Sequence, residues 1–153
     1  MNSKLSLKKE IEETVASISI PANGFSRPQL NKEIEERLLA KGWSKQPKIS
    51  GERNDLDIEA KIDFIKERVG VEVSFSHHSF IGIDLLKFQT MSYSVLDYID
   101  VGVYVIATRN LLERMKNRGQ KWQGSLTFEK VCRYLPHFKS AIQVPIFVLG
   151  LDE

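Results

Sequence analysis

Two acidic residues on neighbouring predicted strands have types and a spacing that could do chemistry. The segment from Ile58 to Ser76 predicts a β-hairpin whose reversal is centred on Glu67 and Arg68. Folding the hairpin symmetrically about that point places Asp63 opposite Glu72. Directly opposed Cβ atoms lie roughly 4.5–5.5 Å apart, so the two carboxylates would repel each other. A hard cation such as Mg²⁺ takes carboxylate oxygens and would turn this repulsion into attraction.

Further polar residues share the predicted face of the hairpin. Ser74 follows Glu72 by two residues and therefore points to the same side, and Lys61 falls opposite Ser74 in this register. The other positions are apolar and predict burial: Ile62 and Phe64 on the first strand, and Val69, Val71, Val73 and Phe75 on the second. A solvated acid pair on an ordinary surface hairpin is the alternative to a metal site.

A helix before the hairpin carries three more carboxylates. Ser26 and Pro28 suit the start of this helix, and Gly42 suits its end. The glutamates along it are Glu33, Glu35 and Glu36. They could form a solvated acidic face, or one of them could look across at the hairpin and support a metal.

The remaining chain predicts helices and two buried strands. Helical spacing of apolar residues is found over Leu5–Ile18, Phe80–Tyr98, Asn110–Asn117 and Thr127–Leu135, whereas Asp100–Ala107 and Pro145–Leu151 predict strands and Ser44–Asp57 predicts a loop or short irregular strand. In the helix after the hairpin we expect buried positions at Leu85, Leu86, Phe88, Met91 and Leu96, with Asp84, Lys87 and Gln89 facing elsewhere. This order of elements predicts an α/β sandwich around a mixed sheet.

Composition limits the setting but not the activity. The 153 residues suit one domain, and a net charge of +2 supports a nucleic-acid partner only weakly. The single cysteine, Cys132, cannot form an internal disulfide, which favours a reducing, cytoplasmic location. We expect Cys132 to lie on a helix and to face the protein core. The charged N-terminal segment predicts no secretion signal, and no apolar run is long enough to predict a membrane span.

The ordered set of motifs resembles a known enzyme family. The sequence D-F-I-K-E-R-V-G-V-E-V-S-F, then S-F-I-G-I-D-L, I-D-V-G-V and P-I-F-V-L-G-L, is similar to the BglII/BstYI family of type II restriction endonucleases, within the PD-(D/E)xK nuclease superfamily. The likeness covers residues 63–150. It implies a restriction-endonuclease-like α/β core, with a central mixed sheet flanked by helices. The whole chain, 1–153, would be one nuclease domain: N-terminal helices in 1–42, the catalytic hairpin, helix and core strand in 58–107, and helices with the last strand in 108–153.

The resemblance also implies roles for residues of the hairpin. Asp63 and Glu72 would hold the metal together with the carbonyl of Val73, and Mg²⁺ would be the cofactor, with Mn²⁺ able to substitute. Relatives cut both strands of a short palindrome containing GATC, as homodimers bound to double-stranded DNA. The third motif position is lysine in most of the superfamily, but here it is Ser74, which can orient a water but cannot act as a cation. Lys61 is our candidate for the missing ammonium, the alternative being a solvated strand-edge lysine.

Residues that would contact DNA follow the third motif position in this family. Ser76 and His77 occupy that place here, and His78 should point the other way along an extended segment. The basic stretch from Arg133 to Lys139 is a second candidate, for phosphate or base contacts.

Three other functions compete with a restriction enzyme. A PD-(D/E)xK nuclease for repair or junction resolution would share the chemistry but not the fixed palindrome. A DNA-binding protein with a decayed site is possible because of Ser74. An α/β interaction domain without DNA affinity is compatible with the nearly balanced charge.

Overall fold

The chain folds around a five-stranded mixed sheet. The computed structural model describes residues 2–45, 62–93 and 97–153. The strands lie in sequence order and are β1 (Ser44–Lys45), β2 (Phe64–Lys66), β3 (Val69–Ser74), β4 (Val101–Ala107) and β5 (Ile146–Leu151). The β1–β2 and β2–β3 pairs are antiparallel, whereas β3–β4 and β4–β5 are parallel. The predicted mixed sheet is therefore confirmed.

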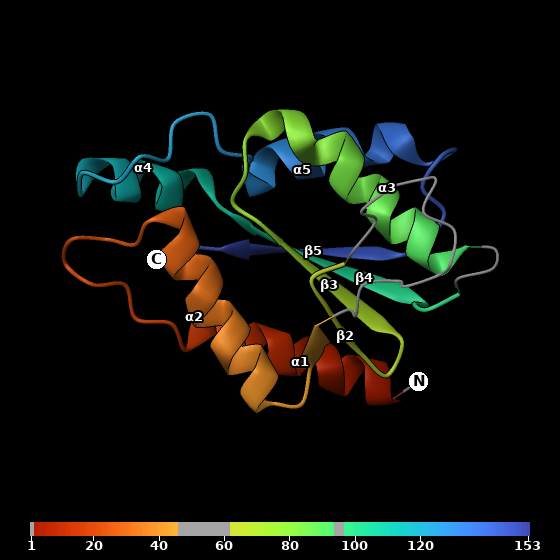
Figure 1. Cartoon of the computed structure of the whole chain (residues 1–153). Helices are drawn as coiled ribbons and strands as arrows, with labels where there is room; N and C mark the ends of the chain where they lie inside the picture. Colours follow the sequence, from red (N-terminus) through yellow and green to blue (C-terminus); the bar gives the residue numbers. More distant parts are fainter. Residues whose placement is uncertain (1, 46–61, 94–96) are drawn as a thin grey trace, which may run out of the picture.

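Helices cover both faces of the sheet (Figure 1). On one face lie α1 (Asn2–Ala16) and α2 (Arg27–Ala40), and on the other lie α3 (Ile81–Ser92) and α5 (Phe128–Tyr134). The remaining helical elements are α4 (Arg109–Asn117) and the short 3₁₀ turns η1 (His78–Phe80) and η2 (Leu135–Phe138). The sheet thus separates two hydrophobic clusters, one containing Ile11 and Leu30 from α1 and α2, the other containing Phe88 from α3.

The central hairpin has the predicted register. Phe64 pairs with Val71 and Lys66 with Val69, so the reversal is at Glu67 and Arg68. These two residues have φ angles of 46° and 65°, and two-residue hairpin turns with two left-handed residues match the natural twist of the strands.

The first strand of the hairpin is shorter than expected because the chain bends at Asp63. Strand β2 begins only at Phe64. Both Ile62 and Phe64 are buried, but Ile62 packs in the cluster with Phe88 and Phe64 in the cluster with Leu30. The predicted Ile62–Phe64 ladder on one face is therefore wrong, since the bend interrupts the two-residue alternation of a strand.

The helix after the hairpin is shorter than predicted, and its buried face differs from the prediction. Leu85, Phe88 and Met91 are buried as expected, but Leu86 is 54% exposed. Asp84, which we expected to face elsewhere, is only 5% exposed. The reason is helical spacing, because Asp84 lies four residues before Phe88 and seven before Met91 on the same face.

Two paired glycines make room on the sheet, Gly102 for Phe88 of α3 and Gly70 for Ile62 and Ile99. Gly70 of β3 pairs with Gly102 of β4. A Cβ atom added at Gly102 would lie 2.4 Å from Cδ1 of Phe88, and one added at Gly70 would lie 2.9 Å from Cδ1 of Ile62. The absence of side chains at these positions therefore makes room for the buried face of α3 and its neighbours.

The predicted start of α2 is confirmed, whereas the predicted burial of Cys132 in α5 is wrong. Ser26 caps α2 in a capping box with Gln29, as its type and position predict. By contrast, Cys132 is exposed and not core-facing, because Val131 takes the buried position of α5. Within the described residues, no helix has the length and apolar character needed to span a membrane.

Candidate active site

The two acidic residues of the hairpin, Asp63 and Glu72, lie next to each other at the start of β2. The backbone N–H of Asp63 donates to Oε2 of Glu72 at 3.3 Å. The N–H of Val73 in turn donates to Oδ2 of Asp63 at 2.8 Å. The Glu72 carboxylate therefore accepts from the amide of Asp63, and the Asp63 carboxylate accepts from the amide that follows Glu72. The bend at Asp63 brings its side chain to Val73.

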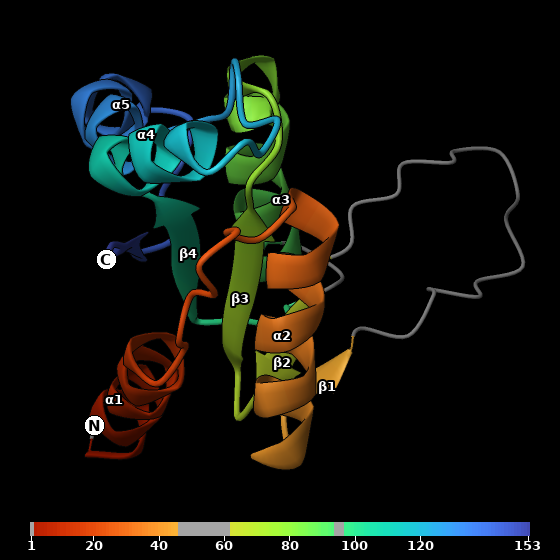
Figure 2. The same ribbon diagram turned by 90° about the vertical axis from the view of Figure 1, so that its left-hand side faces the viewer.

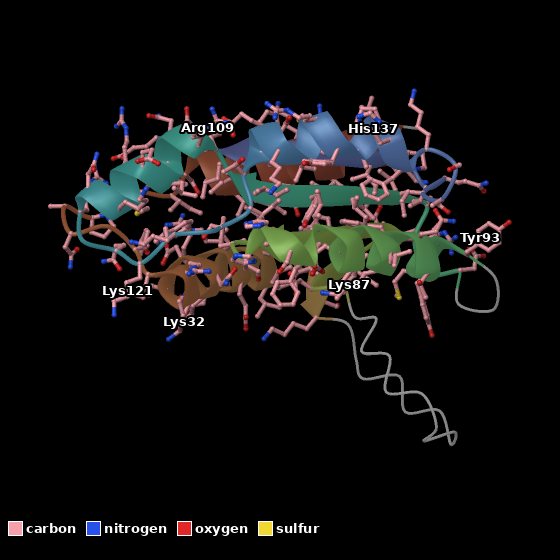
Figure 3. The ribbon with its side chains drawn as sticks, turned by 90° about the horizontal axis from the view of Figure 1, so that it is seen from above. Lys32, Lys87, Tyr93, Arg109, Lys121 and His137 are labelled. Carbon is pink, nitrogen blue, oxygen red and sulfur yellow. The ribbon has the colours of Figure 1, made fainter. Side chains whose placement is uncertain are left out.

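A lysine from α3 contacts Glu72 and a third acid, Asp84. Nζ of Lys87 lies 2.6 Å from Oε1 of Glu72 and 3.5 Å from Oδ1 of Asp84. The side chain of Lys87 is 21% exposed, whereas that of Glu72 is 5% exposed. In Figure 3, Lys87 lies on the side of α3 that is nearer to β1 and α2, and Arg109 lies on the opposite side. Our expectation that Asp84 faces away from the core was wrong, whereas Lys87 is only partly buried.

Burial and like charge make this cluster electrostatically costly. Burial raises the pKa of Glu72 to about 8, and the charge of Asp63 adds to the rise, while Lys87 opposes it. Burial also raises the pKa of Asp63, against the bond from the Val73 amide and the charge of Lys87. Burial would lower the pKa of Lys87, but the charge and hydrogen bond of Glu72, followed by the charges of Asp84 and Asp63, raise it overall. The site therefore favours a cation beside its carboxylates.

Behind this cluster lies a second layer of buried polar groups. The hydroxyl of Tyr104, on β4, donates to Oδ2 of Asp84 at 2.5 Å. Ser74 is 3% exposed, and its side chain is a hydrogen-bond partner of Tyr104. Burial raises the pKa of Tyr104, as does the adjacent Asp84, so the phenol stays protonated and can donate. Asp84 thus connects Tyr104 to Lys87.

An open hollow of about 190 Å³ lies beside Asp63. Its lining includes Asp63 and Val73 from the hairpin region, Asn31 and Glu35 from α2, and Lys45 from β1. Glu35 forms an ion pair with Lys45 at 2.5 Å, and its charge contributes to raising the pKa of Asp63. Among the three glutamates, Glu35 is therefore the one that looks across at the hairpin; Figure 2 shows α2 alongside β2 and β1.

The donor set fits a hard divalent cation. Asp63 and Glu72 supply carboxylate oxygens, and Val73 lines the same hollow as Asp63. Across the parts of the chain that the structure describes, no three His, Cys, Asp or Glu side chains form a metal cage. Mg²⁺ usually binds through one or two carboxylates together with substrate phosphates and waters, so a two-acid site suits it. Lys61, our candidate cation, lies outside the described residues.

The segment after β3 turns instead of continuing as a strand. The rings of His77 and His78 lie 4.0 Å apart at 36°, so the expectation that they point in opposite directions was wrong. The reason is the 3₁₀ turn η1, for which His77 is the capping residue. Ser76 is exposed, and its carbonyl accepts a hydrogen bond from the Leu126 amide at 2.9 Å.

A basic hollow lies beside His78. It measures about 350 Å³ and includes His78, Arg109, Lys130 and Arg133 in its lining. Arg133 thus joins two basic residues that we did not single out. Lys139 is exposed near the end of η2 but is not part of this lining. The structure therefore separates the two ends of the stretch that we treated as one basic loop.

Sequence reasoning missed Lys87, Asp84 and Tyr104 as members of the acidic site. For Asp84 a signal was present, namely its spacing from Phe88 and Met91. For Lys87 the only local signal is its position three residues after Asp84 on a helix, which places the two on neighbouring positions of one surface. That this surface meets Glu72 depends on how α3 packs across the sheet.

Comparisons with known proteins agree with this geometry. A family model described as "Restriction endonuclease BglII/BglIII" matches residues 1–151. The chain is similar to a solved structure of BglII complexed with a DNA 16-mer, with a TM-score of 0.74 and 23% identity, covering 97% of this chain and 70% of the other. It is also similar to free BglII, with a TM-score of 0.67 and 24% identity, covering 97% and 71%. No curated protein matches the sequence.

Proposed function

This chain belongs to the restriction endonuclease BglII/BglIII family, and from that premise we propose that it cuts both strands of duplex DNA at a short palindrome containing GATC, using Mg²⁺. Family membership makes it a type II site-specific deoxyribonuclease. Such enzymes use divalent metal ions; Mg²⁺ itself, with Mn²⁺ as a substitute, is part of the proposal. The single cysteine supports a cytoplasmic setting.

The observation that carries the proposal is the meeting of Asp63, which lines an open hollow, with the buried Glu72 behind it. We assign these two carboxylates and the carbonyl of Val73 as the metal ligands. When bound, Mg²⁺ would lower the pKa of a coordinated water and stabilise charge on the phosphate. The amides of Asp63 and Val73 orient the carboxylates before any substrate arrives. This preorganisation supports catalysis because less reorganisation is needed in the transition state.

Ser74 has a different task from the lysine of the wider superfamily. Its hydroxyl is buried and has Tyr104 as a partner, which supports a role in positioning the polar layer behind the carboxylates. Serine carries no charge to place beside a phosphate. Any side-chain cation that acts beside the metal must therefore come from another residue.

DNA contacts are proposed on both sides of the histidine pair. Ser76 and His77 are exposed next to the end of β3, which supports base contacts. Arg133, together with Arg109 and Lys130 in the basic hollow, supports phosphate contacts. Lys139 is assigned to more distant phosphate contacts, since it is exposed outside that hollow. The related BglII structure contains a DNA 16-mer, which favours duplex DNA as the partner.

A homodimer is proposed because a two-fold assembly reads a palindrome with two identical surfaces. An outward apolar stripe at and just before α3 supports this: Phe80 is 47%, Ile83 56% and Leu86 54% exposed. These residues recur at three-residue intervals and so follow one side of the helix. A second copy of the chain is the proposed partner for this stripe. Sedimentation of Leu86→Glu should give a monomer where the unchanged chain gives a dimer.

One experiment tests the proposed activity. Unmethylated phage DNA is digested with the purified chain in Mg²⁺ and separately in Mn²⁺, and the ends of the fragments are sequenced. We expect one recurrent palindromic site containing GATC, cut in both strands. Cleavage without a fixed site would instead indicate a repair or junction nuclease. DNA binding without cleavage in either metal would indicate a DNA-binding protein that has lost its activity.

A further inference from the structure

The candidate active site lacks a cation at the position where the superfamily pattern has one. Ser74 is only 3% exposed, its side chain is hydrogen-bonded with Tyr104, and it is uncharged. Hydrolysis of a phosphodiester concentrates negative charge on the phosphate oxygens, and a preorganised cation stabilises that charge. An ammonium or guanidinium from elsewhere in the fold could therefore add to the charge stabilisation that a bound metal ion supplies.

Lys87 has the position and the support for this task. Its Nζ lies 2.6 Å from Oε1 of Glu72, although the two residues are 15 positions apart and belong to α3 and β3. The side chain of Lys87 is 21% exposed, whereas that of Glu72 is 5% exposed. A ligand that approaches the pair from solvent would therefore meet Lys87 before it met the Glu72 carboxylate.

An ion pair and a hydrogen bond fix where this ammonium lies. Asp84 contacts Lys87 at 3.5 Å through Oδ1 and accepts the hydroxyl of Tyr104 at 2.5 Å through Oδ2. Tyr104 is fully buried in the sheet, so it is a rigid support. Long lysine side chains are otherwise mobile, and anchoring one at a site restricts the positions that its charge can take.

We propose that Lys87 is a catalytic residue, which contacts a non-bridging oxygen of the scissile phosphate and stabilises its charge in the transition state, in place of a lysine at position 74. Asp84 and Tyr104 are its positioning residues. This inference rests on the proposed nuclease function. It assigns no proton transfer to Lys87, which remains an ammonium throughout.

A second lysine of equal exposure provides a matched control. Nζ of Lys66 lies 2.9 Å from Oε1 of Glu10, and its side chain is also 21% exposed. This ion pair joins β2 to α1, and within the described residues the hydrogen bonds of Lys66 go to Glu10 and the Lys41 carbonyl, not to Asp63 or Glu72. Removing Lys66 therefore measures what the loss of a half-buried, ion-paired lysine does in general.

The test compares Lys87→Met with Lys66→Met, because methionine keeps most of the aliphatic stem and its packing. Single-turnover cleavage of the site found by digestion is measured in Mg²⁺. We expect Lys87→Met to lower the rate constant by about 10²- to 10³-fold, the usual loss when one transition-state donor is removed. Lys66→Met should stay within about three-fold of the unchanged enzyme.

Two further readouts separate catalysis from a structural role. Duplex affinity in Ca²⁺ and the thermal shift caused by Mn²⁺ should both persist in Lys87→Met, because the metal ligands remain. In Lys87→Ala, propylammonium added to the buffer should restore part of the cleavage rate, whereas it should not affect Lys66→Ala. A lysine that serves only to hold α3 against β3 would give no such rescue.

The outcomes distinguish this inference from the function on which it rests. If the unchanged chain cleaves no DNA in Mg²⁺ or Mn²⁺, the proposed nuclease function fails. If it cleaves and Lys87→Met keeps its rate within about three-fold, the function stands and the role of Lys87 is overturned. If Lys87→Met fails to fold, Lys87→Gln takes its place, because glutamine can still donate a hydrogen bond to Glu72 but carries no charge. A normal cleavage rate in folded Lys87→Gln would then overturn the inference as well.

Discussion

The molecule contains two clusters of acids and bases with similar composition and opposite settings. The inner cluster consists of Asp63, Glu72, Asp84 and Lys87, and the outer cluster of Lys4, Arg68, Asp97 and Asp100. In the outer cluster Arg68 contacts Asp97 at 2.7 Å and Asp100 at 2.8 Å, and Lys4 contacts Asp100 at 2.5 Å. Its side chains are 38–67% exposed, whereas Glu72 and Asp84 are 5% and 7% exposed.

The difference in setting reverses the direction of the acid pKa values. Hydrogen bonds from Arg68 and then Lys4 hold the pKa of Asp100 below its usual range. In the inner cluster, burial raises the pKa values of Asp63 and Glu72 above theirs. The outer cluster has the charge arrangement of a stabilising ion network, whereas the raised acid pKa values of the inner cluster are those expected of the proposed active site. Four predictions separate them.

The largest expected difference is in cleavage. Asp63→Asn and Glu72→Gln each remove a proposed metal ligand and should lower the single-turnover rate by an order of 10³-fold. Duplex binding, measured by gel shift, should persist or improve, because a negative charge next to the phosphates is lost. Asp100→Asn should cleave at the normal rate. Equal losses in all three variants would remove the functional distinction between the clusters.

The next difference is in the response to metal. Mn²⁺ at 100 times its dissociation constant should stabilise the unchanged chain by about 2.7 kcal/mol, since a ligand that binds only the folded state adds its binding free energy. Calorimetry should show this stabilisation in Asp100→Asn and not in Glu72→Gln. A normal metal response in Glu72→Gln would place the metal elsewhere.

In metal-free buffer the two clusters should change stability in opposite directions. The folded-state pKa of Asp63 is raised, so its ionisation opposes folding above the unfolded-state pKa of about 3.9. Asparagine keeps the oxygen that accepts the Val73 amide, and Asp63→Asn should therefore raise the free energy of unfolding at pH 7.5 by about 0.5–2 kcal/mol. Asp100→Asn should lower it by less than about 1 kcal/mol, because the pair is exposed. Urea titration measures both.

The smallest effect is the pH dependence of that last change. The folded-state pKa of Asp100 is depressed, so its contribution is present above about pH 4 and is lost as the pH falls toward the folded-state value. The melting temperatures of the unchanged chain and Asp100→Asn should therefore converge in acid. Added salt at pH 7 should also bring them closer, because exposed charges are screened. A difference that does not shrink between about pH 4 and about pH 2 would contradict the electrostatic origin.

Local sequence patterns predicted the framework of the inner cluster well. The symmetric turn at Glu67 and Arg68 set the hairpin register, and the two buried apolar runs predicted β4 and β5. Turn type and strand alternation act over a few residues, so they can be recognised without knowledge of the tertiary structure. The same patterns placed Asp63 and Glu72 on adjacent strands, and their reciprocal main-chain bonds agree with that placement.

What could not be predicted depends on packing between distant elements. Lys87 meets Glu72 because α3 crosses the sheet at one particular distance and rotation, which no local pattern encodes. The bend at Asp63 and the turn at His78 likewise break alternation at single residues and move side chains to unexpected places. Leu86 was predicted to be buried from its type alone, and its exposure depends on which side of α3 faces the sheet.

Gly70 and Gly102 leave part of the sheet without side chains. The distance between α3 and the sheet is therefore sensitive to the addition of a single methyl group. Phe88 would be 2.4 Å from a new Cβ at position 102, so alanine there acts as a wedge under α3. Phe88 directly follows Lys87, and lifting the helix by a fraction of an ångström would draw the ammonium away from its carboxylate. The position of the Lys87 ammonium thus depends on Gly102 of β4, a residue that has no side chain.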